Sequence, residues 1–265
     1  NIKNIEIPVE FGKSVNPQKI KEELDKNPNI KAVFTTLDET SSGALTDIKS
    51  IGEIIKNYPN TVFVVDCVSG LIVEEMQMDE WGVDVAVSAS QKALAIPPGL
   101  GFMAISPKAL KLAEANKTRS AYFDIFDYIA NWKRNQTPFT PAVSLVEQLK
   151  LRLEKIKAEG LENYRKRYRA NTEIIRQGLK ELGFEVFAEN PANCVTGIMT
   201  EKYDASEIVR IMREKHNIEI APSGGELKEK FFRVGNFGAI EKEEIKQFLS
   251  AIKQTLSEVK QKCNV

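Results

Sequence analysis

The stretch from Val62 to Gly101 reads VFVVDCVSGLIVEEMQMDEWGVDVAVSASQKALAIPPGLG and predicts the centre of the fold. Its two apolar runs, Val62–Val65 and Val83–Val87, are typical of buried strands. The first run ends in Asp66, and the second leads into small polar residues and Lys92. Ligands of open α/β sheets bind at the carboxyl ends of the strands. We therefore expect this carboxylate and this amine to lie together at one edge of a parallel sheet.

Lys92 stands out from the other lysines because small residues and proline surround it between two apolar strands. An amine withdrawn from water can attack a carbonyl carbon and form a Schiff base. Asp66 could hold the ring nitrogen of a pyridine cofactor in its protonated form. Taken singly, Lys92 could be a loop residue without a role and Asp66 a turn residue at the end of a strand. Together the pair favours a Schiff-base site.

The composition limits the classes of partner. The chain has 265 residues, of which 42% are hydrophobic and 28% charged, so it can bury a substantial core. Its formal net charge of zero gives no electrostatic reason to expect nucleic acid or an anionic membrane as a partner. No apolar run approaches the roughly 20 residues of a membrane span, and residues 1–10 do not resemble a signal peptide.

Cysteine and histidine are scarce. The three cysteines stand singly, which argues against a disulfide framework and favours a reducing, cytoplasmic location. His216 is the only histidine, which argues against Ser-His-Asp, Cys-His and multi-histidine zinc sites if one chain must supply them. We expect no metal in the site.

Alternating strand and helix patterns predict an α/β sheet in the first part of the chain. Two long helical patterns, 143–159 and 161–182, meet at Gly160. There we place the boundary between a large domain (1–159) and a smaller α+β domain (160–265). The other predicted strands are 5–9, 30–37, 62–66, 83–87, 101–105, 184–187, 195–200, 218–221 and 231–234. The other predicted helices are 17–26, 47–57, 107–115, 205–215 and one from about 240.

Four sequence elements recur in this order and spacing in class V pyridoxal-phosphate aminotransferases. The chain resembles their alanine–glyoxylate and serine–pyruvate aminotransferase branch, which includes members labelled small subunits of a soluble hydrogenase. The resemblance implies the fold type I, PLP-dependent transferase-like architecture: a mainly parallel sheet flanked by helices, with a smaller α+β C-terminal domain. The elements are Glu39–Gly43, Val65–Ser69, Asp79–Asp84, and Ser88–Leu94 with Pro97–Leu100.

The resemblance implies roles for single residues. Lys92 matches the lysine that binds pyridoxal 5'-phosphate covalently, and Asp66 matches the aspartate on the pyridine nitrogen. Val68 matches the residue that packs on one face of the ring. Thr40 matches a hydroxyl near the phenolic oxygen and the substrate, and Gln91 matches a phosphate contact.

Three further positions concern the substrate and a second subunit. Arg233 is a charge inside the apolar run Phe231–Val234, where a substrate carboxylate is a natural bidentate partner. It matches the family's carboxylate-binding arginine, although pairing with a structural Asp or Glu stays open. Thr137 and Thr140 match residues that reach the phosphate of the neighbouring subunit. The resemblance thereby implies a homodimer with shared sites, while ordinary loop hydroxyls remain the alternative.

The expected reaction is transamination between a small amino acid, alanine or serine, and a small 2-oxo acid, glyoxylate or pyruvate. A pyridoxal-phosphate lyase or cysteine desulfurase is an alternative, but those relatives place histidine before the lysine, where this chain has Gln91. The family also has an N-terminal segment with a Ser-Gly phosphate loop and an aromatic residue that stacks on the ring. Nothing in this sequence matches that segment. A non-catalytic partner subunit or a fragment is therefore a third interpretation.

Overall fold

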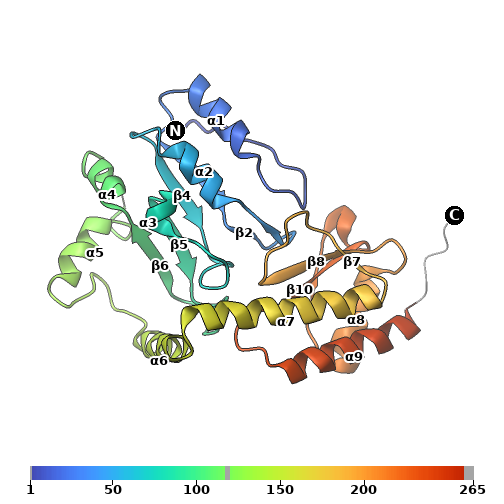
Figure 1. Cartoon of the computed structure of the whole chain (residues 1–265). Helices are drawn as coiled ribbons and strands as arrows, with labels where there is room; N and C mark the ends of the chain where they lie inside the picture. Colours follow the sequence, from blue (N-terminus) through green and yellow to red (C-terminus); the bar gives the residue numbers. More distant parts are fainter. Residues whose placement is uncertain (1, 117–119, 260–265) are drawn as a thin grey trace.

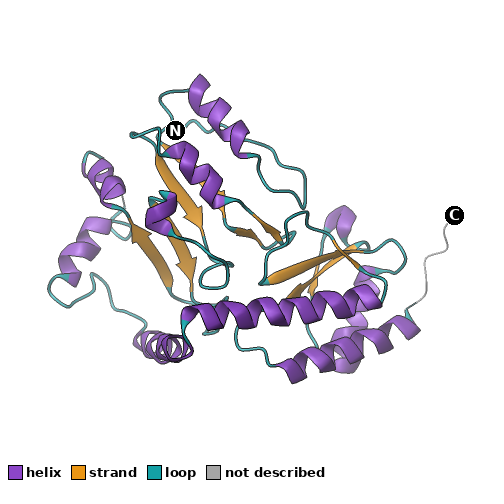
Figure 2. Cartoon of the chain, viewed as in Figure 1, coloured by secondary structure: helices purple, strands orange, loops and turns teal. Residues whose placement is uncertain are grey.

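The computed structural model describes residues 2–116 and 120–259. Two separate sheets form the frame of the molecule, and Figure 2 shows their strands in orange. The larger sheet has the order β1-β4-β5-β6, and the smaller has the order β7-β8-β10-β9. Strands β2 and β3 form a short antiparallel ribbon that is separate from both sheets. The ribbon strands are Asp38–Glu39 and Ala44–Leu45.

The larger sheet is mainly parallel, as the sequence predicts. Strand β1 (Ala32–Thr36) pairs in parallel with β4 (Val62–Asp66), which pairs in parallel with β5 (Val85–Ala89). Strand β6 (Gly101–Ile105) runs antiparallel to β5. The loop between β5 and β6 contains no helix, and a parallel return would need a longer crossover. This loop holds Lys92.

Helices cover one face of the larger sheet (Figure 1). Asn16 caps α1 (Pro17–Lys26) by accepting the N–H of Gln18 at 2.9 Å, and Asp47 caps α2 (Ile48–Ile55) in the same way. The buried residues of α1 and α2 form a core with Phe63 and Val65 of β4 and with Ala86 of β5. On the opposite face Phe34 is 76% exposed and Met103 is 55% exposed. Helices α3, α4 and α5 complete this part (Met78–Trp81, Pro107–Glu114 and Ile125–Trp132).

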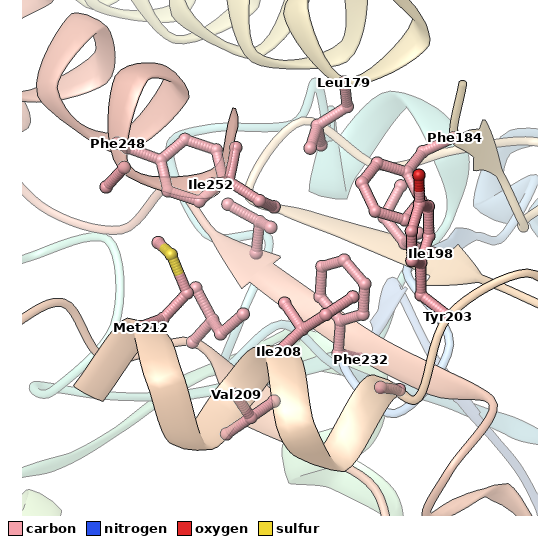
Figure 3. Packing of buried hydrophobic residues seen from close by; sticks show 14 of the residues in the cluster. Leu179, Phe184, Ile198, Tyr203, Ile208, Val209, Met212, Phe232, Phe248 and Ile252 are labelled. Atoms are coloured by element: carbon pink, nitrogen blue, oxygen red, sulfur yellow. The ribbon is translucent and has the colours of Figure 1, made fainter. Parts of the chain in front are cut away.

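The smaller sheet is antiparallel and has its own core. Helices α8 and α9 pack against it, and Figure 3 shows Ile208 and Met212 of α8 beside Phe232 and Ile252. Every side chain in this cluster comes from residue 175 or later. The strands and helices are β7 (Glu185–Val186), β8 (Val195–Met199), α8 (Ala205–His216), β9 (Ala221–Pro222), the 3-10 turn η1 (Gly225–Leu227), β10 (Phe231–Gly235) and α9 (Lys242–Glu258).

Two long helices join the sheets. Helix α6 (Val143–Glu159) ends at Gly160, whose φ of 83° is costly for other residues, and α7 (Leu161–Glu181) follows at once. In Figure 1 α7 extends along both sheets. A third core cluster includes Tyr164 and Tyr168 of α7 together with Ala93 and Leu94, which follow Lys92, and Cys194, which precedes β8. The division into domains 1–159 and 160–265 stays a prediction.

Three predicted strands differ from the structure. Residues 5–9 form no strand, and Ile5 and Val9 are each 42% exposed beside Pro8, which has no N–H to pair. The strand predicted at 83–87 lies at Val85–Ala89. It begins after Asp84, where the side-chain carboxylate, and not a backbone carbonyl of β5, accepts the Phe63 N–H at 2.9 Å. The strand predicted at 218–221 is reduced to Ala221–Pro222.

Candidate active site

The carboxyl ends of β4 and β5 meet, as their parallel pairing requires. Asp66 ends β4 and stands in register with Val87 of β5. The next residue, Cys67, donates its N–H to the carbonyl of Val87 at 2.8 Å and accepts the hydroxyl of Ser88 on its own carbonyl at 3.3 Å. The Asp66 side chain is exposed, and its Oδ1 accepts the N–H of Val68 at 2.8 Å. One carboxylate oxygen therefore holds the turn, and the other faces outward.

A serine closes the loop that holds the lysine. Ser90 is fully buried; its hydroxyl donates to the carbonyl of Pro97 at 2.8 Å and accepts the N–H of Leu100 at 3.2 Å. The carbonyl of Lys92 accepts the N–H of Ala95 at 2.9 Å. Ala95 has a φ of 55°, a left-handed conformation that completes the tight turn. These bonds hold the backbone of Lys92 in place.

The Lys92 side chain is half-buried and points to an aromatic ring. Its Nζ lies 4.6 Å from the ring centroid of Phe237, in the turn after β10. Across residues 2–116 and 120–259, no hydrogen bond or ion pair engages this ammonium group. The amine is therefore held near a ring but is not occupied by a protein acceptor.

Arg233 lies in β10 and reaches the loop after β2. Its Nη1 donates to the carbonyl of Thr40 at 3.0 Å, and its Nη2 donates to the carbonyl of Pro222 at 3.0 Å. Its Nε is buried without a partner. No aspartate or glutamate of the described residues forms an ion pair with it, so the alternative of a structural acid partner is wrong here. The guanidinium donates hydrogen bonds to two backbone carbonyls, and no acidic side chain of the described residues neutralises its charge.

Thr40 connects this arginine to the end of β4. Its hydroxyl shares a hydrogen bond with the hydroxyl of Ser69, which lies three residues after Asp66 and is buried. Thr40 therefore links Arg233 to the loop that follows Asp66. Lys92 joins the same region through Phe237, four residues after Arg233.

The remaining predicted residues have weaker connections. Val68 is half-buried, and Gln91 is exposed beside Lys92. Thr137 and Thr140 are exposed in the segment between α5 and α6, where residues 136–141 line an open hollow of about 800 Å³. The Thr137 hydroxyl donates to the carbonyl of Phe139 at 2.7 Å. Within the described ranges, no hydrogen bond joins either threonine to the other predicted site residues.

A buried cluster of two carboxylates and a thiol near the site is not predicted by any sequence pattern. One potential ligand atom from each of Asp38, Glu74 and Cys194 lies within 4.8 Å of the other two. The Cys194 thiol donates to Asp38 Oδ2, while Glu74 accepts the backbone N–H and the side-chain amide of Asn193. Burial, with a smaller contribution from Glu74, raises the pKa of Asp38 to about 7. No sequence pattern links these positions, because they are far apart in the chain.

Phe237 is not among the site residues that the sequence predicts. It follows a strand that ends at Gly235 and has no motif of its own.

The described cysteines, Cys67 and Cys194, are both buried, and Cys263 lies outside the described residues. No helix in the described part of the chain has both the length and the apolar character that a membrane span requires.

Comparison with known proteins adds independent information about the whole chain. The sequence profile of the family described as "Aminotransferase class-V" matches residues 2–234. An uncharacterised aminotransferase of Methanocaldococcus jannaschii is 36% identical over 261 residues, which are 96% of this chain and 67% of that protein. A serine–glyoxylate aminotransferase of Arabidopsis thaliana is 32% identical over 258 residues, 94% of this chain and 64% of the relative.

Solved structures give the same picture. The crystal structure of an alanine–glyoxylate aminotransferase from Nostoc sp. matches with a TM-score of 0.87 and 28% sequence identity. The match covers 92% of this chain and 66% of that one. The chain thus spans about two thirds of the length of the proteins it resembles.

Proposed function

The chain belongs to the class-V aminotransferase family, and from this premise we propose that it transfers an amino group with pyridoxal 5'-phosphate as cofactor. The amino donor is a small amino acid, alanine or serine, and the acceptor is a small 2-oxo acid, glyoxylate or pyruvate. What supports this most is the parallel pairing that sets the end of β4, where Asp66 lies, beside β5, which leads into the loop of Lys92, together with the bond from Arg233 to the Thr40 carbonyl.

The available side chains fit this cofactor. The Lys92 amine has no protein acceptor among the described residues, so it is available for a covalent bond to a carbonyl carbon. One oxygen of the exposed Asp66 carboxylate is available to a protonated ring nitrogen. When bound, pyridoxal phosphate supplies an aldehyde that condenses with amines and a ring that withdraws electrons from the substrate's Cα. The donor set therefore matches both ends of the pyridoxal ring.

Each residue has a separate task in this proposal. Lys92 would hold the cofactor through its amine; once the amino donor has replaced it there, the free amine would accept the proton from the substrate Cα and, as the ammonium, give it to the former aldehyde carbon of the cofactor. Asp66 keeps the ring nitrogen protonated. Arg233 binds the substrate carboxylate and fixes the direction of the Cα–H bond relative to Lys92. The buried, unpartnered Nε–H of Arg233 is a donor that such a carboxylate can use.

The supporting residues are assigned in the same way. Val68 packs on one face of the ring, Thr40 lies near the phenolic oxygen and the substrate, and Gln91 contacts the phosphate. Thr40 also sets the position of Arg233, whose Nη1 it accepts on its carbonyl. The remaining phosphate contacts lie outside this set of residues.

We further propose a homodimer, in which Thr137 and Thr140 reach the phosphate in the neighbouring subunit. The surface around these residues is unusually apolar: Phe123, Trp132 and Val143 are 74%, 76% and 62% exposed. Large exposed apolar patches mark interfaces. The open position of both threonines fits residues that act on a second chain. A cytoplasmic location stays a prediction.

The alternatives have less support. A cysteine desulfurase needs a mobile, accessible cysteine, and among the described residues the two cysteines, Cys67 and Cys194, are both buried. The likeness to NifS-like proteins, at 16% to 18% identity, concerns the fold alone. A non-catalytic subunit would have no reason to keep an unengaged amine beside an exposed carboxylate at the sheet edge.

The proposal is tested by cofactor binding and by turnover. Protein incubated with pyridoxal phosphate should develop a new absorbance band near the visible edge, which alanine bleaches and glyoxylate restores. Lys92→Ala should lack the band, whereas Lys111→Ala, on exposed α4, should keep it. Production of pyruvate from alanine and glyoxylate should follow the same order. A cofactor-binding protein that releases sulfide from cysteine faster than it forms pyruvate from alanine contradicts the proposal, as does a wild-type protein without the band.

A further inference from the structure

Helix α7 contacts both the loop of Lys92 and the turn that holds Phe237. The Tyr164 hydroxyl donates to the carbonyl of Ala93, the residue after Lys92, at 2.9 Å. One helical turn later, the Tyr168 hydroxyl donates to the carbonyl of Gly238, the residue after Phe237, at 2.7 Å. The same hydroxyl accepts the N–H of Gly238, also at 2.7 Å. Two tyrosines thus bind the two backbone segments whose side chains meet.

The tyrosine pair is rigid. Tyr164 and Tyr168 are 0% and 2% exposed, and their ring centroids lie 5.1 Å apart. The guanidinium of Arg167 lies over Tyr164, 4.8 Å from the ring centroid, and its Nε and Nη2 both donate to the Glu159 carboxylate. Arg152 donates to the Tyr164 hydroxyl at 2.9 Å. Buried hydroxyls with all these bonds have little freedom to move.

The backbone on the other side of Phe237 is fixed as well. Asn236 is buried, donates its N–H to the carbonyl of Cys194 at 2.8 Å, and donates its amide to the Thr172 hydroxyl at 2.9 Å. Thr172 is also on α7. A Cβ atom at Gly235 would lie 3.2 Å from the Phe237 ring, so the absent side chain leaves room for the ring.

We propose that Phe237, Tyr164 and Tyr168 are positioning residues for Lys92. Helix α7 sets the separation between the lysine loop and the turn after β10, and the Phe237 ring then covers the ammonium group at 4.6 Å. A cation at this distance from a ring is attracted to its face. The ring therefore holds the amine in one direction and shields it from solvent.

This arrangement connects Lys92 to substrate binding. Arg233 and Phe237 belong to one continuous segment, four residues apart, and the same helix holds that segment. A movement of β10 that changes the position of the guanidinium also changes the position of the ring. The consequence for transamination rests on the proposed function, but the positioning of the amine does not.

The test measures the amine itself, in protein without added cofactor. Each lysine is acylated with limiting acetic anhydride, and labelling rates are read by mass spectrometry of peptides. Phe237→Leu, which removes the π face but keeps an apolar side chain, should raise labelling of Lys92 about two- to fivefold, the factor that corresponds to an accessible cation–π pair. Labelling of Lys253 on α9 should be unchanged. Phe237→Tyr should restore the wild-type rate at Lys92.

Two further variants separate positioning from general loss of stability. Phe184→Leu alters a ring in the core of the smaller sheet and should leave Lys92 labelling unchanged. Tyr168→Phe keeps the ring and deletes the hydroxyl, so it should raise Lys92 labelling while its melting curve stays cooperative. Tyr58→Phe, which deletes a surface hydroxyl bonded to Asp25, is its matched control. Unchanged Lys92 labelling in both Phe237→Leu and Tyr168→Phe overturns the proposal.

Turnover distinguishes this proposal from the assignment of function. In an active enzyme, Phe237→Leu should lower kcat about tenfold with little change in the KM for alanine, because a misplaced amine affects the chemical step rather than binding. Altered labelling in a protein that does not bind cofactor would contradict the proposed function and leave the positioning intact. Normal turnover with wild-type Lys92 labelling in Phe237→Leu would contradict only the positioning.

Discussion

The guanidinium of Arg233 donates a 3.0 Å hydrogen bond to the backbone carbonyl of Thr40, 193 positions earlier in the chain. This bond connects the smaller antiparallel sheet to the loop beside Asp66. A carbonyl satisfies one donor without cancelling the charge, so the arginine keeps a full positive charge for an anion. The relationship explains how a small-domain strand can serve a site that belongs to the larger sheet.

Arg233→Lys should lower kcat/KM for alanine and for glyoxylate by about 10- to 100-fold. Lysine keeps the charge but cannot form the two parallel hydrogen bonds of a guanidinium, and bonds to charged groups contribute about 1.5–3 kcal/mol. Steady-state kinetics at varied substrate concentration will measure the change. Arg210→Lys, at an exposed position of α8, is the control and should have wild-type constants. Equal losses in both variants would refute a specific role for Arg233.

Asp66→Asn should lower the rate of the half-reaction with alanine on the order of a hundredfold, the size of effect seen when one charge-stabilising contact is removed. Asparagine can still accept the Val68 N–H, so the turn should persist and the melting temperature should change little. Stopped-flow bleaching of the cofactor band measures the rate. Asp79→Asn on α3 is the matched control. A full-speed half-reaction in Asp66→Asn would remove the aspartate from the mechanism.

Asp38→Asn should change the pH dependence of stability. Burial raises the pKa of Asp38 from 3.8 to about 7, against the lowering effects of its bond to Cys194 and of Lys92. Between about pH 4 and pH 7 the folded chain therefore holds a proton that the unfolded chain releases, so stability is lost as the pH rises through this window. Asparagine carries no such proton and escapes the loss.

Urea unfolding at pH 5 and pH 7.5 will measure this difference. The free energy of unfolding of Asp38→Asn relative to wild type should increase with pH, by at most about 1.4 kcal/mol for each unit of the pKa shift. Glu74 and Glu39 also act electrostatically on Asp38 and are present in both proteins, so the difference between the two profiles isolates Asp38. Parallel profiles for the two proteins would show that Asp38 is charged in the folded state at neutral pH.

Leu153→Asp should weaken self-association about 30-fold or more. Leu153 is 45% exposed on α6, the helix that begins at Val143 of the proposed dimer surface, and it lines a hollow with Val146, Leu149 and the charged Lys150, Glu154 and Lys157. A charge buried in an interface costs about 2 kcal/mol or more of binding free energy. Light scattering after size-exclusion chromatography at several concentrations gives the constant. Lys253→Asp on α9 should leave it unchanged, and a wild-type monomer at every concentration would rule out the dimer.

Local patterns were sufficient where neighbouring residues decide the structure. Asn16 before Pro17 and Asp47 before an apolar helical repeat predict α1 and α2, and Gly160 predicts the end of α6. The position of Asp66 at the end of β4, next to the strand that leads into the Lys92 loop, follows from the parallel arrangement of two buried strands. These features depend on short-range hydrogen bonds, side-chain period and one topological rule.

Other features depend on segments that are distant in sequence. Residues 5–9 have the composition of a strand, but no strand in the described part of the chain pairs with them, and β6 runs antiparallel because its loop is short. The Phe237 ring reaches Lys92, and Cys194 reaches Asp38, through packing between the two sheets. Neither contact corresponds to a pattern of residues from which it could be predicted.

The sequence alone therefore determined the family resemblance, the mainly parallel sheet and a set of candidate residues for a cofactor and a carboxylate. Only the three-dimensional packing decided which residues touch: Thr40 with Arg233, and Lys92 with Phe237 beside the tyrosines of α7. The physical reason is the separation along the chain over which each kind of interaction acts. Residue type and local hydrogen bonding set the strands, helices and chemical groups, whereas the burial of two separate cores against α7 sets the distances between those groups.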